Sequence, residues 1–134
     1  MGEGRRWFCD MDEVLVTGVF GSPFDTRAWS DAGRAIWAAL EPLRPTLLSK
    51  VSDHRLALGY AQKRAWVDRE LGRLVPLLVV PDSLGKAPYA LRGDVLVDDD
   101  LVNCDEWLKS GGAAILHREV GATLAAIRAL QGKP

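Results

Sequence analysis

Carboxylates stand directly after two short apolar runs of the sequence. Asp10 and Asp12 follow the first run, and Asp98 and Asp99 follow the second. Aspartate is common where strands end, but two strands that each finish with a pair of aspartates are harder to explain by turn preference alone. Several carboxylates that converge at one place repel one another, which raises their pKa values and destabilises the fold. A divalent cation would remove that cost.

A hydroxyl and a lysine accompany these carboxylates. Ser49 ends a further apolar run, and Lys86 lies in the connection before the run that carries Asp98. A small set of oxygen ligands suits Mg²⁺, with waters completing its shell. Mg²⁺ and an ammonium group neutralise phosphate oxygens, so that a carboxylate can attack phosphorus. A second aspartate, two residues further on, can protonate the leaving alcohol and later activate water.

The elements that would position these residues alternate along the chain. We expect strands at residues 6–9, 46–49, 75–80, 94–97 and 113–116. We expect helices at about 25–40, 62–71, from 101 to the glycines at 111–112, and at 120–130. This alternation predicts an α/β fold, a three-layer α/β/α sandwich with a parallel, Rossmann-like sheet of about five strands. The carboxyl ends of such strands form one edge, where active sites lie, so the sheet gathers all the candidate residues there.

The connections leave little room for anything else. The predicted elements use up the gaps from Asp12 to Ser49 and from Ser49 to Lys86, since common connections take about 4–6 residues. We therefore expect a single domain over residues 1–134 with no cap domain. Residues 51–59 are polar and are predicted to form a loop, and 81–92 a connection with one helical turn. The site would be open, shielded only by loops at 17–25 and 51–59, unless a second copy of the chain in a homodimer supplies a lid.

Composition excludes several classes of protein. Seventeen basic and eighteen acidic residues give a formal charge of −1, so the chain as a whole is not steered toward nucleic acid or an anionic membrane. No apolar run approaches the roughly 18 residues that span a bilayer. The first residues lack an apolar stretch of signal-peptide length, which predicts a cytoplasmic protein. Two cysteines cannot make a disulfide framework. The expected partner is a small phosphorylated substrate.

Four motifs in order carry a resemblance. Asp10-Met-Asp-Glu-Val14, a strand-end Ser49, a lysine and Val95-Leu-Val-Asp-Asp99 resemble the motifs of the haloacid dehalogenase (HAD) superfamily. Over most of the chain, roughly 8–117, the sequence also resembles the 5'(3')-deoxyribonucleotidase branch and its uncharacterised bacterial relatives. The segments that carry this second resemblance are Pro45-Thr-Leu-Leu-Ser, the stretch 62–72, Gly93-Asp-Val-Leu-Val-Asp-Asp, Asn103, Trp107 and Gly111-Gly-Ala-Ala-Ile-Leu116.

The resemblance implies a role for each aspartate. Asp10 matches the nucleophile, which forms an aspartyl-phosphate and ligates Mg²⁺. Asp12 matches the general acid and base, with its backbone carbonyl facing the metal. Asp98 and Asp99 match the acidic pair that holds the metal directly or through water. The nucleotidases carry a basic or polar residue where this chain has Asp100, and a third carboxylate there would weaken the attraction for an anionic substrate.

Substrate contacts are implied for other residues. Ser49 matches the hydroxyl that holds a phosphate oxygen, and Lys86 matches the lysine that pairs with phosphate and nucleophile. Lys63 is the alternative lysine, but it falls in a predicted helix, so Lys86 is favoured. Phe24 and Trp29 follow the loop after the first strand, where an aromatic ring could stack on a nucleobase, although core packing is favoured for both.

These inferences lead to one main hypothesis and two alternatives. The main hypothesis is a Mg²⁺-dependent phosphomonoesterase that works through an aspartyl-phosphate on a nucleotide or another small phosphomonoester. The first alternative keeps the chemistry but makes the substrate a nucleic-acid end or a phosphoprotein. The second is a non-catalytic domain that binds a metal or a partner. The complete set of motif residues favours an enzyme, because a degenerate member would more often lack its nucleophile.

Overall fold

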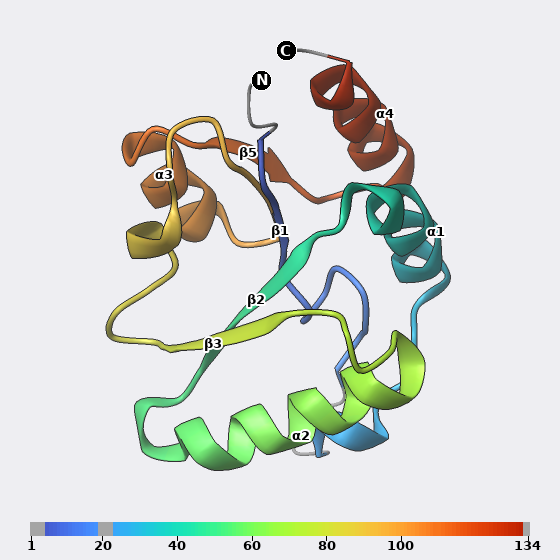
Figure 1. Cartoon of the computed structure of the whole chain (residues 1–134), viewed down its shortest axis with the longest axis vertical. Helices are drawn as coiled ribbons and strands as arrows, with labels where there is room; N and C mark the ends of the chain where they lie inside the picture. Colours follow the sequence, from blue (N-terminus) through green and yellow to red (C-terminus); the bar gives the residue numbers. More distant parts are fainter. Residues whose placement is uncertain (1–4, 19–22, 133–134) are drawn as a thin grey trace.

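The computed structural model describes residues 5–18 and 23–132, and it contains a five-stranded sheet with four α-helices (Figure 1). The strands are β1 (Trp7–Cys9), β2 (Thr46–Val51), β3 (Leu77–Pro81), β4 (Val95–Asp98) and β5 (Ala113–Leu116). The helices are α1 (Asp31–Leu40), α2 (Leu56–Glu70), α3 (Leu101–Lys109) and α4 (Val120–Gln131). The strand order is β3-β2-β1-β4-β5 and every pairing is parallel, as the sequence predicts.

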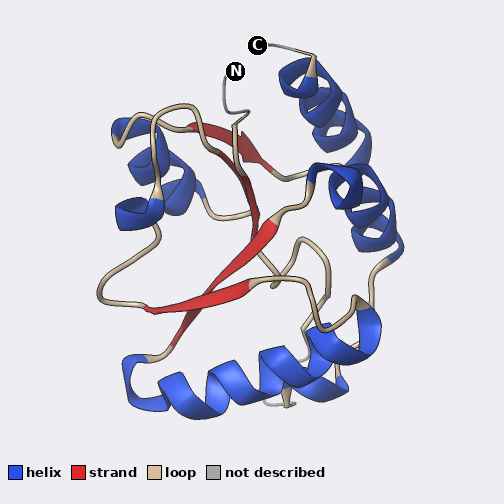
Figure 2. Ribbon diagram, viewed as in Figure 1, coloured by secondary structure: helices blue, strands red, loops and turns tan. Residues whose placement is uncertain are grey.

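Helices cover both faces of the sheet (Figure 2). Successive strand residues alternate between two cores, because side chains in a strand point to opposite faces. Cys9 and Val97 belong to the larger core, together with apolar residues of α1, α2 and α4. Phe8 and Leu96 belong to the smaller core, in which they pack with Trp107 of α3. The result is the predicted three-layer sandwich, with α1 and α4 side by side on one face.

The first helix begins later than the sequence predicts. Residues Phe24–Thr26 form a separate 3-10 turn, and α1 starts only after Ser30. The Ser30 hydroxyl oxygen accepts a hydrogen bond from the Gly33 N–H at 2.8 Å, which makes Ser30 the N-cap. A bridge between Val16 and Trp29 holds the chain extended before that cap, so a helix cannot start earlier.

The expectation of a loop at residues 51–59 is wrong. Val51 is the last residue of β2, Asp53–Arg55 form a 3-10 turn, and α2 runs from Leu56. The sequence hides this start because Arg55, the N-cap residue, offers no side-chain cap, and the first turn of α2 is exposed and has no apolar period. The predicted helical turn between β3 and β4 is present at Ala87–Tyr89.

No cap domain interrupts the sheet in the part of the chain that the structure describes. The loop predicted at 17–25 is described only at its two ends, since residues 19–22 lie outside the described residues. None of the described helices is long and apolar enough to cross a membrane.

The segment after β1 folds back on itself and packs against α1. The Leu15 and Val16 N–H groups donate to the Met11 carbonyl at 3.0 and 3.2 Å, and all three side chains are buried. Gly33 of α1 lies so close that an added Cβ would be 2.0 Å from the Leu15 carbonyl oxygen. The absence of a side chain at Gly33 therefore fixes where the loop that carries Asp12 can lie.

We expect Gly33→Ala to lower the free energy of unfolding by roughly 1–3 kcal/mol, because the new methyl group forces α1 and the loop apart. Alanine otherwise favours a helix over glycine by about 1 kcal/mol, so propensity alone predicts the opposite sign. Urea denaturation at equilibrium measures the change. Ala38→Gly, on the exposed side of the same helix, is the control and should cost no more than about 1 kcal/mol. A Gly33→Ala protein as stable as the wild type would contradict the close approach.

Candidate active site

The pairing of β1 with β4 brings two aspartates together. Cys9 of β1 lies opposite Val97 of β4, and the next residue on each strand is an aspartate. The Asp10 N–H donates to the Val97 carbonyl at 2.9 Å, which extends the ladder by one step. Because the strands are parallel, Asp10 and Asp98 emerge at the same edge of the sheet, as predicted from the sequence.

Lys86 joins these two carboxylates. Its Nζ lies 3.0 Å from Asp10 Oδ1 and 2.6 Å from Asp98 Oδ2. Lys86 is 1% exposed and Asp98 is fully buried. The connection from β3 to β4 passes over β2 and β1 in the sheet order, and this path carries Lys86 across the carboxyl ends of the strands. Removing one partner from such a buried group is expensive, so the three residues depend on one another.

Asp100, the third aspartate of the run 98–100, caps a helix. The Asp100 side chain accepts a hydrogen bond from the Asn103 N–H at 3.1 Å and so caps α3. This cap places Asn103 in the first turn, where its Nδ2 donates to Asp98 Oδ2 at 3.1 Å. The Asn103 Oδ1 is buried and accepts no hydrogen bond from the residues that the structure describes. Asp100 therefore has a structural role at the start of α3, and its effect on an anionic substrate stays a prediction.

These residues fit a divalent cation. One carboxylate oxygen each from Asp10, Asp98 and Asp99 lies within 4.8 Å of the others. Within this cluster of described residues three carboxylates share the one ammonium of Lys86, and Mg²⁺ would offset the excess of negative charge. The unpartnered Asn103 oxygen adds a further neutral oxygen, which a hard cation or a water in its shell can use.

Burial dominates the electrostatics of this cluster. It raises the pKa of Asp10 well above its ordinary value, Lys86 opposes that shift, and Asp98 reinforces it. Burial also raises the pKa of Asp99. For Lys86 burial acts to lower the pKa, but the Asp10 and Asp98 carboxylates outweigh it and keep the pKa above its ordinary value. The ionised form of Asp10, which a nucleophile needs, is therefore favoured by positive charge brought to this edge.

The two cysteines are not nucleophiles in this arrangement. Burial raises the pKa of the Cys9 thiol well above its ordinary value, and it raises the pKa of Cys104 to about 12. Both thiols stay protonated near neutral pH, and a protonated thiol is a poor nucleophile.

A second cluster surrounds Asp12. Lys63, from the middle of α2, donates to Asp12 Oδ2 at 3.0 Å, to Ser49 Oγ, and to the Lys50 carbonyl at 3.3 Å. Arg27 Nη1 donates to Asp12 Oδ1 at 2.6 Å. Each oxygen of Asp12 is thus held by a different cation. Lys86 and Lys63 were the two candidates for the lysine that pairs with phosphate and nucleophile. They occupy separate positions, Lys86 beside Asp10 and Lys63 beside Asp12 and Ser49.

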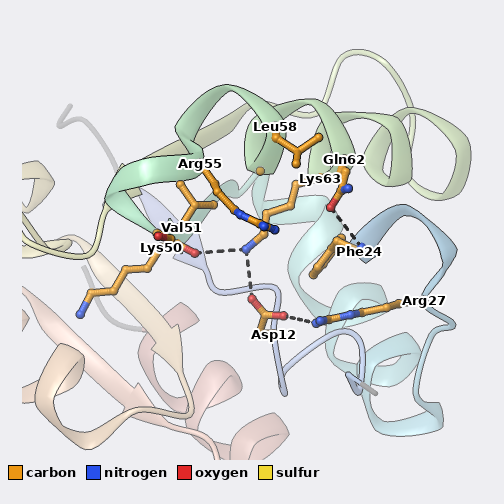
Figure 3. A pocket seen from close by; sticks show the side chains of 11 residues that line it. Asp12, Phe24, Arg27, Lys50, Val51, Arg55, Leu58, Gln62 and Lys63 are labelled. Atoms are coloured by element: carbon orange, nitrogen blue, oxygen red, sulfur yellow. Dashed lines mark hydrogen bonds and ion pairs between the residues drawn. The ribbon is translucent and has the colours of Figure 1, made fainter. Parts of the chain in front are cut away.

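A pocket of about 220 Å³ opens beside this second cluster (Figure 3). Phe24 lines it, with the Lys63 ammonium and the Arg27 guanidinium each 4.9 Å from the centre of its ring. Trp29 does not line it. Its ring packs against Trp66 at 5.2 Å between centroids, and its Nε1 donates to a carboxylate of α2 at 2.8 Å. Phe24 lies at the wall of the pocket, but it is buried in the larger core and packs against Trp66 at 6.2 Å between centroids. Core packing, which the sequence favours for both aromatic residues, is thus confirmed for both.

The sequence did not predict Arg27 and Asn103 as site residues. Arg27 lies in an irregular segment, where no period predicts which way a side chain points. Asn103 was named only as part of the resemblance. Its position three residues after Asp100, which can cap a helix, could have indicated that it lies near the site. That spacing puts its side chain in the first turn of a helix that starts at the sheet edge.

Comparison with known proteins supports the fold. No protein-family model matches the chain, and no curated protein matches its sequence. Among solved structures, the chain is similar to a protein of Mesorhizobium loti that is named only provisionally, as a HAD-like phosphatase. The TM-score is 0.61 at 17% sequence identity, over 94% of this chain and 87% of that one. At this identity the likeness shows a shared fold.

We expect Lys86→Met to lower the free energy of unfolding by about 3–5 kcal/mol in EDTA, because the buried Asp10 and Asp98 carboxylates lose the ammonium that pairs with both. Lys63→Met is the matched control. It should cost clearly less, since Asp12 keeps Arg27 and its side chain is 39% exposed. Urea denaturation of both proteins gives the comparison. A larger loss for Lys63→Met would show that the cluster around Asp10 is not the more demanding of the two.

We expect millimolar Mg²⁺ to raise the melting temperature of the wild type relative to EDTA, since a ligand at 100 times its Kd adds about 2.7 kcal/mol to stability. Asp98→Asn should abolish most of that rise. Asp100→Asn is the control and should keep it, because asparagine caps a helix as well as aspartate does. Equal rises in Asp98→Asn and the wild type would place the cation elsewhere.

Proposed function

We propose that the protein is a Mg²⁺-dependent phosphomonoesterase of the HAD type that works through an aspartyl-phosphate on Asp10. The observation that carries this proposal is the contact of Lys86 with both Asp10 and Asp98. Asp99 lies in the same acidic group, and Asp12 follows Asp10 by two residues in the sequence. This edge of the sheet combines a carboxylate nucleophile, a second carboxylate for proton transfer and a donor set for a cation. The shared fold with a protein named as a HAD-like phosphatase supports the same conclusion.

The proposed chemistry has two steps. Asp10 attacks the phosphorus atom, the bond from phosphorus to the alcohol oxygen breaks, and protonated Asp12 gives its proton to that oxygen. Asp12 then takes a proton from a water molecule as this water attacks the aspartyl-phosphate. This second step releases inorganic phosphate and restores the Asp10 carboxylate and the proton on Asp12.

Other residues hold the reacting groups in place. Lys86 fixes the orientation of the Asp10 carboxylate by donating to Oδ1. Lys63 and Ser49, which contact each other, are donors that a phosphate oxygen can share. Mg²⁺, when held by Asp10, Asp98 and Asp99, would neutralise charge on the phosphoryl group. The site would then bind the phosphate between its two clusters.

The substrate that we propose is a small phosphomonoester, with nucleotides among the candidates. The pocket of about 220 Å³ beside Asp12 is open to solvent and can receive the part of the substrate that leaves. A second copy of the chain as a lid stays a prediction.

We expect the purified protein to hydrolyse an aryl phosphate with Mg²⁺ and to lose this activity in excess EDTA. Asp10→Asn should lower kcat by about 10³-fold or more, because the attacking charge is gone. Asp12→Asn should cost about 10²–10⁴-fold on an alkyl phosphate and less on an aryl phosphate, whose good leaving group needs little protonation. Asp100→Asn is the control. Stabilisation by Mg²⁺ without any turnover would instead indicate a non-catalytic metal-binding domain.

A further inference from the structure

The pocket beside Asp12 carries an excess of positive charge. Its ionisable lining residues in the described part of the chain are Asp12, Arg27, Lys50, Arg55 and Lys63, four cations and one carboxylate. Both oxygens of that carboxylate already accept hydrogen bonds, from Lys63 and from Arg27. The remaining cations therefore have no negative partner within the pocket lining.

Arg55 is the cation that faces the pocket without a partner. It ends the turn before α2, where its N–H donates to the Ser52 carbonyl at 2.9 Å. Its side chain makes no cap, ion pair or hydrogen bond with the other described residues. Figure 3 shows its guanidinium reaching over the pocket toward Lys63, whereas the side chain of Lys50 points away. The nearby carboxylate of Asp53 is engaged elsewhere, since it accepts a hydrogen bond from the Ser83 N–H at 3.0 Å.

The position of Asp12 determines what enters this pocket. Asp12 is the residue proposed to protonate the leaving oxygen, and it forms part of the pocket wall. With the phosphate held near Lys63 and Ser49, the alcohol portion of the substrate extends into the pocket. Leu58, which is half exposed at the pocket, offers apolar contacts to its carbon atoms. A pocket of about 220 Å³ that is open to solvent has room for a short carbon chain with one further group.

We propose that the substrate is a small phosphomonoester whose alcohol portion carries a second anionic group, and that Arg55 binds this group. The proposal rests on the proposed function, because it uses the direction of the leaving group. A planar guanidinium binds carboxylate and phosphate alike through two parallel hydrogen bonds, so both are the shared chemistry. An uncharged alcohol portion would leave Arg55 without a partner.

Three substrates that differ only at one end test the second anion. They are 3-hydroxypropyl phosphate, 3-(phosphonooxy)propanoate and 1,3-propanediol bisphosphate, assayed with Mg²⁺. We expect kcat/KM to be about tenfold or more higher for one or both of the doubly anionic compounds, after a statistical correction for the two phosphates of the third. The better of the two identifies carboxylate or phosphate as the second anion. Equal values for all three would overturn the proposal.

Two matched variants test the residue. Arg55→Gln should remove the preference, while Lys50→Gln, which deletes the same charge from the same pocket rim, should keep it. Thermal unfolding checks that both variants fold, and Arg55 has no cap bond to lose. A preference that survives in Arg55→Gln would overturn the assignment. An equal loss in both variants would also overturn it, since it would show a response to overall charge and not a contact.

Binding separates this proposal from the proposed function. Calorimetric titration of the Asp10→Asn protein with the same three compounds, in Mg²⁺, measures affinity without turnover. Tighter binding of a doubly anionic compound, lost in Asp10→Asn/Arg55→Gln, supports the anion site even if the wild type turns over none of them. That combined result would contradict the phosphatase and leave the anion site standing. Equal affinities for the three compounds would contradict the anion site alone.

Discussion

The structure depends on the burial of like charges at one edge of its sheet. Asp10 and Asp98 are adjacent because β1 pairs with β4, and both are buried, so water cannot solvate their charges. Lys86 is the group that makes this arrangement tolerable, and the connection from β3 to β4 must cross two strands to deliver it. Asn103 adds one more donor, which α3 can place only because Asp100 caps its first turn. Four segments thus meet to satisfy one electrostatic requirement.

The second group of charges lies under a different constraint. Asp12 is 39% exposed, so water screens its interactions, and its contacts with Arg27 and Lys63 contribute less to folding. Side chains in such a place can exchange partners at modest cost. The buried half of the edge is therefore suited to holding a fixed cation and the proposed nucleophile, Asp10. The half-exposed half is suited to meeting groups that come and go.

The sequence predicted the part of the site that strand ends determine. Strand segments apolar on both faces, each followed by aspartates, placed Asp10 and Asp98 at one edge, because parallel strands all finish on the same side. It could not predict that Lys63 reaches this edge, since a long side chain in a helix with charges all around gives no sign of its direction. The start of α2 was hidden for a related reason. Its first turn buries almost nothing, so no apolar pattern marks it, and the sequence predicts a loop where Arg55 lies.

That exposed first turn of α2 has an evolutionary consequence. Arg55 and Leu58 stand at the rim of the pocket and support no core contact, so replacing them should change which leaving groups are accepted and leave the fold nearly unaffected. Residues around Lys86 have no such freedom, because each substitution there leaves another buried charge without its partner. If the proposed function holds, selection could redirect this scaffold toward new substrates by altering one helical turn, with the residues around Lys86 unchanged.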